Sequence, residues 1–190
     1  MSKELLLTAF FAVLTAVGGL LAIPTPWFVP FTMQTFVVLM SGLLLGPKYG
    51  PLSQLFYIAI GMAGLPVFAG GMGGPQIVFM PTFGFLAGFV LVSWVAGTLA
   101  GKANSLLQYG LVCLAAGASL YVVAVPGVYL NLKYVAGMDI GVERALQIAL
   151  LPFIVPDLLK AGLAGCLAHR CVPMLRNAGF YPRRPQKTPA

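Results

Sequence analysis

The sequence has 190 residues, of which 59% are hydrophobic and only 8% are charged, with a net charge of +7. Soluble globular domains carry about 25% charged residues, so a soluble fold is excluded. Residues 49–101 and 103–132 contain no charged side chain, whereas a transmembrane helix needs only about 20 apolar residues. Because the apolar runs are unbroken and do not alternate with polar residues, the sequence predicts an all-α, polytopic protein of the lipid bilayer and not a β-barrel.

Six apolar segments follow one another along the chain, which predicts six transmembrane helices. The first is longer than the hydrophobic region of a signal peptide and is therefore expected to remain as a helix. The second and third are short for a span, and the Gly- and Pro-rich residues 46–51 separate them. After Pro126 and Gly127 a more polar segment is expected to form an external loop. The apolar segments are residues 5–23, 33–45, 52–63, 82–100, 105–125 and a last region that reaches His169.

Basic residues are distributed unevenly between the two predicted sides of the membrane. With six spans both termini share a side, and eight of the 11 Lys and Arg residues lie there. The opposite loops carry only Lys133 and Arg144, and Lys160 lies within the last segment. Because cytoplasmic loops are enriched in Lys and Arg, both termini are predicted to be cytoplasmic. The eight are Lys3, Lys48, Lys102, Arg170, Arg176, Arg183, Arg184 and Lys187.

The same reasoning divides the chain into two parts. Residues 1–175 are expected to form one six-helix, membrane-embedded substrate-binding domain. Residues 176–190, with their prolines and basic side chains, are expected to form a loosely ordered basic cytoplasmic tail.

Several function classes find no support in the sequence. No basic stripe with stacking aromatic residues indicates nucleic-acid binding. Three Cys residues and one His, in or at the ends of apolar segments, indicate neither a disulfide framework nor a metal site, and no cofactor is expected. The glycines at 70–74 lack the Lys-Ser/Thr ending of a phosphate-binding loop, and no nucleophile is paired with a base, so an enzyme is disfavoured.

The most informative residues are Asp157 and Lys160 in the last segment. Each charge near the bilayer centre costs about 2.5 to 3.5 kcal/mol, so two such residues indicate an ion pair or a polar ligand site. Three positions apart, they share a helix face. Counting from Arg170 at about 1.5 Å per residue puts Asp157 in the outer half of the membrane, where a ligand from outside can reach it. Pro156 lacks an N–H and predicts a helix break beside the pair.

In the first segment, Ala9, Ala12 and Ala16 stand three and four positions apart. Such a stripe of small residues lets another helix approach closely. The pattern fits an internal packing face as well as a face for a partner protein.

Several motifs, in this order, resemble the biotin-uptake S component family (BioY-type) of energy-coupling-factor transporters, and the resemblance covers residues 5–170. It implies six helices, a membrane-embedded subunit that binds biotin with high affinity, and an energising module made of a transmembrane coupling protein and two ATPases. The motifs are Pro-Phe-Thr-Met-Gln-Thr at 30–35, Gly-Leu-Leu-Leu-Gly-Pro at 42–47, Tyr57, the Gly-rich residues 61–71, Pro-Thr-Phe-Gly-Phe-Leu-Ala-Gly-Phe at 81–89 and Leu-Pro-Phe-Ile-Val-Pro-Asp-Leu-Leu-Lys at 151–160.

The resemblance also implies residue roles. Asp157 and Lys160 match the family's Asp and Lys on the last helix, and Ala12 and Ala16 match its alanine motif against the coupling protein. Residues 80–85, Met-Pro-Thr-Phe-Gly-Phe, depart from the Gly-Pro-Thr-Gly-Gly-Tyr common in the family.

Biotin fits the chemistry of these residues. Its ureido ring has two N–H donors and a carbonyl acceptor, which complement a carboxylate and an ammonium group. Apolar side chains are expected around its rings and valerate chain, and polar groups near the outer mouth are expected to bind its carboxylate. The candidates are Trp27, Phe31, Tyr57 and Phe68 for the apolar lining, and Gln76, Asn131 and Lys133 for the carboxylate.

Two other functions remain open on the sequence alone. The chain fits an S component for another vitamin, such as thiamine or riboflavin. It also fits a structural membrane subunit in which Asp157 and Lys160 only pair with each other.

Overall fold

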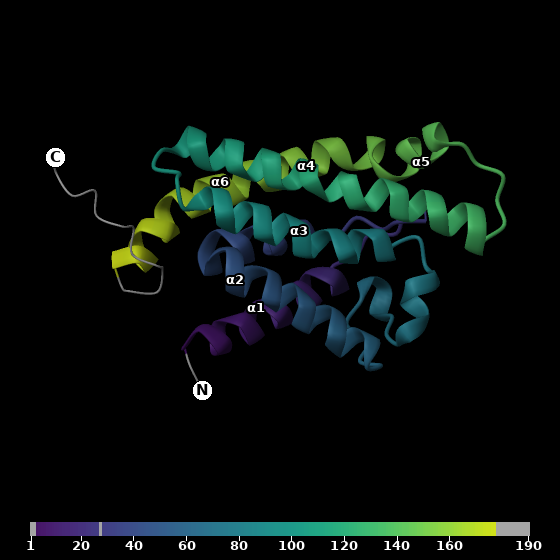
Figure 1. Ribbon diagram of the computed structural model, residues 1–190, viewed down its shortest axis with the longest axis horizontal. Coiled ribbons are helices and arrows are strands. Elements are labelled where there is room, and N and C mark those ends of the chain that lie inside the picture. Colours follow the sequence, from purple (N-terminus) through teal and green to yellow (C-terminus); the bar gives the residue numbers. More distant parts are fainter. Residues whose placement is uncertain (1–2, 27, 178–190) are drawn as a thin grey trace.

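The computed structural model describes residues 3–26 and 28–177 (Figure 1), so Trp27 and most of the predicted tail lie outside the described residues. Within them the secondary structure is helical apart from two isolated β-bridges, Ile23–Phe31 and Phe68–Met72. The all-helical prediction is therefore confirmed. The α-helices are α1 (Lys3–Leu20), α2 (Gln34–Met62), α3 (Phe83–Ala100), α4 (Leu106–Leu130), α5 (Val142–Ala149) and α6 (Ile154–Asn177). Shorter turns are η1 (Ala69–Gly71), η2 (Pro75–Phe79), the π-helical η3 (Asn131–Val135) and η4 (Leu151–Phe153).

Four stretches of the described chain are long and apolar enough to cross a membrane: Lys3–Leu20, Phe83–Ala100, Leu106–Val135 and Val142–Leu175. Large apolar side chains also cover the outer surface. Leu107, Val122 and Leu159, for example, are 73%, 70% and 66% exposed. Lipid removes the free-energy cost that water would impose on such a surface, so the chain is an integral membrane protein. Helix α2 is not among these four stretches. Length and composition alone therefore support fewer than six crossings within the described residues.

Helix α2 reverses direction at Gly46. The side chain of Gln54 donates to Ser41 Oγ at 3.1 Å, although 13 residues of straight helix would separate them by about 20 Å. Gly46 has φ 77° and ψ −176°, a conformation that is essentially restricted to glycine. The predicted stop at residues 46–51 is thus confirmed as a reversal. Helix resumes earlier than the predicted residue 52, because Pro47 suits the first turn of a helix.

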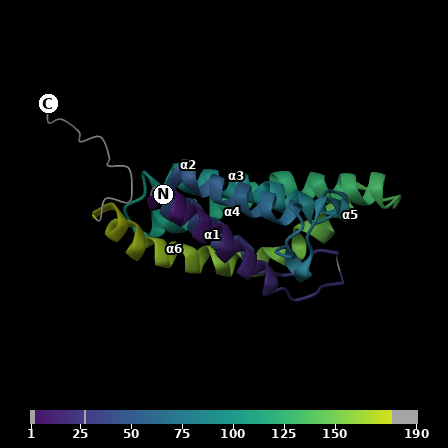
Figure 2. The same ribbon diagram turned by 90° about the horizontal axis from the view of Figure 1, so that it is seen from below.

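Helix α3 lies in the middle of the bundle, with α1 and α2 on one side and α4 and α6 on the other (Figure 1). Figure 2 shows the same helices from below. Helix α3 packs between α2 and α4, α1 lies against α2, and α6 contacts both α2 and α4. The start of α1 and the end of α6 lie at one end of the bundle, and α5 and the long α2–α3 loop lie at the other. The α1–α2 loop lies at that second end as well.

Glycines allow the backbones of α2, α3 and α4 to touch. A Cβ at Gly42 would collide with the backbone oxygen of Ser93, and a Cβ at Gly84 would lie 2.9 Å from the Cα of Gly127. Close backbone approach through small residues is the usual basis of helix packing in membranes.

The end of α4 corrects the predicted loop after Pro126. The helix continues through Pro126 to Leu130, and η3 extends it to Val135. A proline removes one backbone donor, and membrane helices tolerate this where neighbouring groups satisfy the freed carbonyl. Asn131 therefore lies on a helical extension and not in an external loop.

We expect Gly42→Ala to lower the Tm of the purified protein, because the added methyl group meets the backbone of α3. Overpacking of this kind costs about 1 to 3 kcal/mol. Gly162→Ala on α6 is the matched control, since no atom of the described residues lies within 4 Å of a Cβ added there. Alanine is the better helix former by about 0.5 to 1 kcal/mol, so this variant should be as stable as the parent or more so. Equal melting of both variants would contradict the close α2–α3 contact.

Candidate functional site

The ion pair predicted on the last helix is formed at the start of α6. Lys160 Nζ donates to Asp157 Oδ1 at 2.8 Å, and each side chain is only 10% exposed. Asp157 lies in the first turn of α6, where the helix dipole favours a negative charge. Pro156 is also in this turn, where backbone N–H groups have no intrahelical partner. The expected helix break beside the pair is confirmed: α5 ends at Ala149, η4 interrupts the helix, and α6 begins at Ile154, two residues before Pro156.

A second donor holds the same carboxylate from another helix. Tyr121 of α4 donates its hydroxyl to Asp157 Oδ2 at 2.5 Å. Both carboxylate oxygens of Asp157 therefore accept a hydrogen bond, one from α6 and one from α4. The sequence analysis did not single out Tyr121. Its position within an apolar segment could have identified it, because a buried tyrosine hydroxyl usually has a hydrogen-bond partner.

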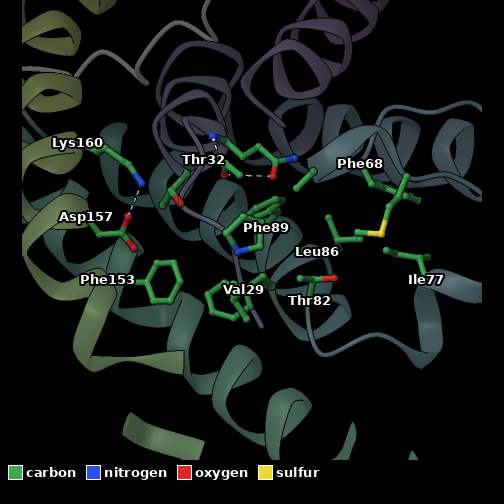
Figure 3. Close-up of a pocket in the computed structure, with 16 residues that line it drawn as sticks. Val29, Thr32, Phe68, Ile77, Thr82, Leu86, Phe89, Phe153, Asp157 and Lys160 are labelled. Atoms are coloured by element: carbon green, nitrogen blue, oxygen red, sulfur yellow. Dashed lines mark hydrogen bonds and ion pairs between the residues drawn. The ribbon is translucent and has the colours of Figure 1, made fainter. Parts of the chain in front are cut away.

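Asp157 and Lys160 line a cavity of about 40 Å³, which has room for about three water molecules. Figure 3 shows the pair projecting from one side of the cavity, with Phe68 and Ile77 on the opposite side. Aromatic rings form much of the wall between them: Phe85 and Phe153 lie 5.5 Å apart between ring centroids. The predicted lining residue Phe31 packs edge-on against Phe153 at 5.0 Å, but among the described residues it is not part of the lining. The lining is mainly apolar, with the ion pair at one end.

Residues from the two long loops close this cavity. Val29 and Pro30 come from the α1–α2 loop, and Phe68, Ala69 and Met72 come from the α2–α3 loop. The chain segments that separate α1, α2 and α3 therefore form one side of the cavity wall. Access to the ion pair from that side depends on their position.

Gln34 supplies a polar group that sequence reasoning did not single out. It lines the cavity and is 3% exposed. Its Nε2 donates to Tyr57 Oη at 2.5 Å, and Tyr57 Oη donates to the backbone oxygen of Val67 at 3.2 Å. Tyr57 is fully buried behind Gln34, and among the described residues it is not part of the cavity lining. Tyr57 thus supports a cavity residue and ties α2 to the α2–α3 loop.

Thr82 contributes a hydroxyl group to the cavity wall. Its Oγ1 is buried and has no hydrogen-bond partner within residues 3–26 and 28–177. Buried hydroxyl groups are usually satisfied. Thr82 Oγ1 is therefore available to a polar group inside the cavity.

The other predicted polar residues lie elsewhere. Gln76 is exposed, donates to the backbone oxygen of Gly73 and borders a neighbouring pocket, which shares Met72 and Ile77 with the cavity lining. Asn131 is 7% exposed on η3, and Lys133 donates to Tyr129 Oη at 2.8 Å. In the described part of the chain, none of these three lines the cavity of the ion pair. Their predicted positions near the ligand depended on a loop after Pro126 and on the path of the Gly-rich loop, which the sequence does not determine.

The alanines of α1 differ in burial. Ala12 is 2% exposed and belongs to the core, whereas Ala16 is half-buried at the edge of that core. Phe10, Val13 and Val17 form the exposed side of the same helix, at 54%, 58% and 47%. At Ala12 the stripe is therefore an internal packing face, one of the two alternatives that the sequence left open, and the partner contact that the resemblance implies for Ala12 has no support from its burial. The role of Ala16 stays a prediction.

The chain is similar in sequence to a known family of proteins. Residues 1–177 match the BioY family. The chain is 38% identical over 169 residues to the biotin transporter BioY of Thermotoga maritima, covering 88% of this chain and 95% of that protein. It is 39% identical over 177 residues to the probable biotin transporter BioY of Lysinibacillus sphaericus, covering 92% and 89%.

Solved structures agree with these relatives. The crystal structure of the S-component for biotin from an ECF-type ABC transporter superposes with a TM-score of 0.69 at 27% identity, covering 89% of this chain and 90% of that one. FolT bound with folic acid has a TM-score of 0.53 at 18% identity and shares the fold, covering 95% and 92%. The extent of the family match and the identity to the relatives lead to one conclusion: this chain belongs to the BioY family.

Proposed function

We propose that this chain is the substrate-binding component of a biotin transporter in the cell membrane. It binds biotin from outside in the cavity that Asp157 and Lys160 line, and it delivers the vitamin inward with an ATP-driven module. The observation that carries the proposal is a buried ion pair at one end of an otherwise apolar, aromatic cavity. The names of the relatives and of the solved S-component support biotin as the ligand.

The proposed contacts follow from the chemistry of each group. Asp157 accepts from the N–H groups of the ureido ring, and Lys160 donates to its carbonyl oxygen. The rings of Phe85, Phe89 and Phe153 contact the apolar part of the ligand. The hydroxyl of Thr82 is unsatisfied among the described residues, and it supplies a donor to the ligand at the wall where α3 begins.

The cavity must widen for this ligand to enter, because about 40 Å³ does not hold a bicyclic vitamin. The α1–α2 and α2–α3 loops contribute to the wall, and their displacement exposes the ion pair. Movement of the α2–α3 loop breaks its contacts with α2, which are the Tyr57–Val67 hydrogen bond and the Tyr57–Phe68 ring contact. The contribution of both loops to the wall supports entry from the end of the bundle where they lie (Figure 2).

The proposal includes the topology, the domain organisation and the partners. Residues 1–175 form one membrane domain with six crossings, α2 contributing two through its reversal at Gly46. Residues 176–190 are the cytoplasmic tail. The partners are a transmembrane coupling protein and two ATPases, and the exposed apolar side of α1 beside Ala16 is the proposed contact.

Asp157→Asn should weaken biotin binding about tenfold to a hundredfold, because a charge-assisted hydrogen bond contributes about 1.5 to 3 kcal/mol. Isothermal titration with purified protein measures the change. Asp157→Asn/Lys160→Met is the control, since it leaves no stranded buried charge that lowers the folded yield. If the folded double variant binds biotin as tightly as the parent, the pair is structural. Thiamine and riboflavin titrated in parallel identify an S component for another vitamin.

Cysteines introduced singly at positions 72 and 102 of a Cys-free variant should react with a membrane-impermeant maleimide from opposite sides. Position 72 should be labelled in intact cells and position 102 only after permeabilisation, because basic residues gather at the end that carries Lys102. Labelling of both positions in intact cells would disprove the proposed topology.

Ala16→Trp should abolish co-purification with the coupling protein and biotin uptake, while biotin binding by the isolated subunit stays at the parent level. Ala16 is half-buried at the edge of the core, so the larger ring fills the proposed contact, and the Tm of the variant is measured beside its binding. Ala12→Trp is the informative comparison: Ala12 is 2% exposed, so tryptophan should lower folded yield and Tm by overpacking. Normal co-purification of Ala16→Trp would show that the partner uses another face.

A further inference from the structure

The carboxylate of Asp157 is held between two helices by donors of different kinds. Lys160 approaches Oδ1 from the next turn of the same helix, and Tyr121 approaches Oδ2 from α4. The second bond, at 2.5 Å, joins a phenol to a carboxylate oxygen, and hydrogen bonds to ionised groups are the stronger class.

Tyr121 reaches this carboxylate from outside the ligand cavity. Among the described residues, Tyr121 is not part of the cavity lining, whereas Asp157 is. Both residues border a second hollow between α4 and α6, together with Cys113, Gly117 and Ile154. Asp157 thus forms part of the wall between the cavity and this hollow, with Lys160 on the cavity side and Tyr121 behind.

This arrangement has a consequence for ligand recognition. The terminal torsion of an aspartate is soft, so one lysine on the same helix does not fix the plane of the carboxylate. A second bond to the other oxygen does fix it. An ionised carboxylate accepts about four hydrogen bonds, so Tyr121 and Lys160 leave acceptor positions for the ligand's N–H groups.

We propose that Tyr121 is a positioning residue for ligand recognition, which orients the carboxylate of Asp157 toward the cavity by bonding its far oxygen. This inference rests on the proposed binding of biotin at Asp157. The proposal excludes a competing role for Tyr121. In that role its hydroxyl would block the Asp157 oxygen to which the ligand must bind, and the ligand would have to displace it.

The test compares two tyrosines of α4. Tyr121→Phe should weaken biotin binding about fivefold to thirtyfold. This is less than the loss of about tenfold to a hundredfold that a whole hydrogen bond to a charged group would give, because the bond is present before the ligand binds and only its orienting effect is lost. Tyr129→Phe is the matched control: it removes a hydroxyl from the same helix, one that is bonded to Lys133 and not to Asp157, and should bind like the parent. Equal or tighter binding by Tyr121→Phe would overturn the proposal.

A double-mutant cycle separates positioning from general packing. In the Asp157→Asn background, Tyr121→Phe should change biotin affinity less than about twofold, because the bond on which it acts is already altered. A full penalty that persists in this background would show that Tyr121 only packs α4 against α6. A parent protein that binds no biotin would contradict the proposed function itself, and this inference with it.

Infrared spectroscopy provides a measurement that needs no variant of Tyr121. The sequence has only four Asp and Glu residues, so carboxylate bands are few. The difference spectrum between the parent and Asp157→Asn, without ligand, should contain a carboxylate band and a tyrosine C–O band together. A carboxylate band alone would show that the phenol does not bond to Asp157.

Discussion

The buried amide of Gln54 joins three helices, and the remaining packing depends on it. Its Oε1 accepts from Thr15 of α1 at 3.3 Å, and its Nε2 donates to Ser41 and Ser53, on the two sides of the α2 reversal, at 3.1 and 2.9 Å. Ser41 then bonds to Ser93 of α3 at 2.9 Å. All five side chains are fully buried. In lipid an unsatisfied polar group costs several kcal/mol, so this network holds α1, α2 and α3 in one relative position.

On the other side of α3, helices α4 and α6 are joined by a hydrogen bond as well as by packing. Tyr121 of α4 and Asp157 of α6 meet there, and the ligand cavity lies between this junction and the helices that Gln54 joins. Polar bonds thus hold α1, α2 and α3 together, and another polar bond joins α4 to α6. Aromatic contacts such as Phe85 against Phe153 cross the cavity between these two groups of helices. Apolar contacts are non-directional, so a shift of the rings that line the cavity breaks neither the bonds of Gln54 nor the bond between Tyr121 and Asp157.

How much the sequence predicts depends on how local the determining contact is. Asp157 and Lys160 are three residues apart, so helix periodicity alone pairs them. The apolar segments likewise locate most helices within a few residues. The contact of Tyr121 spans 36 residues, and that of Gln34 with Tyr57 spans 23. Neither follows from a local pattern, because both depend on which helices become neighbours.

The small volume of the cavity has a kinetic consequence for the proposed binding. A ligand larger than the few waters that fit in about 40 Å³ needs a wider cavity, which in the proposed mechanism comes from displacement of the loops that bear Val29 and Phe68. Association that waits for such a motion is slower than diffusional encounter. The same motion limits departure, so the residence time of the bound molecule is governed by how often the loops open as well as by the strength of its contacts.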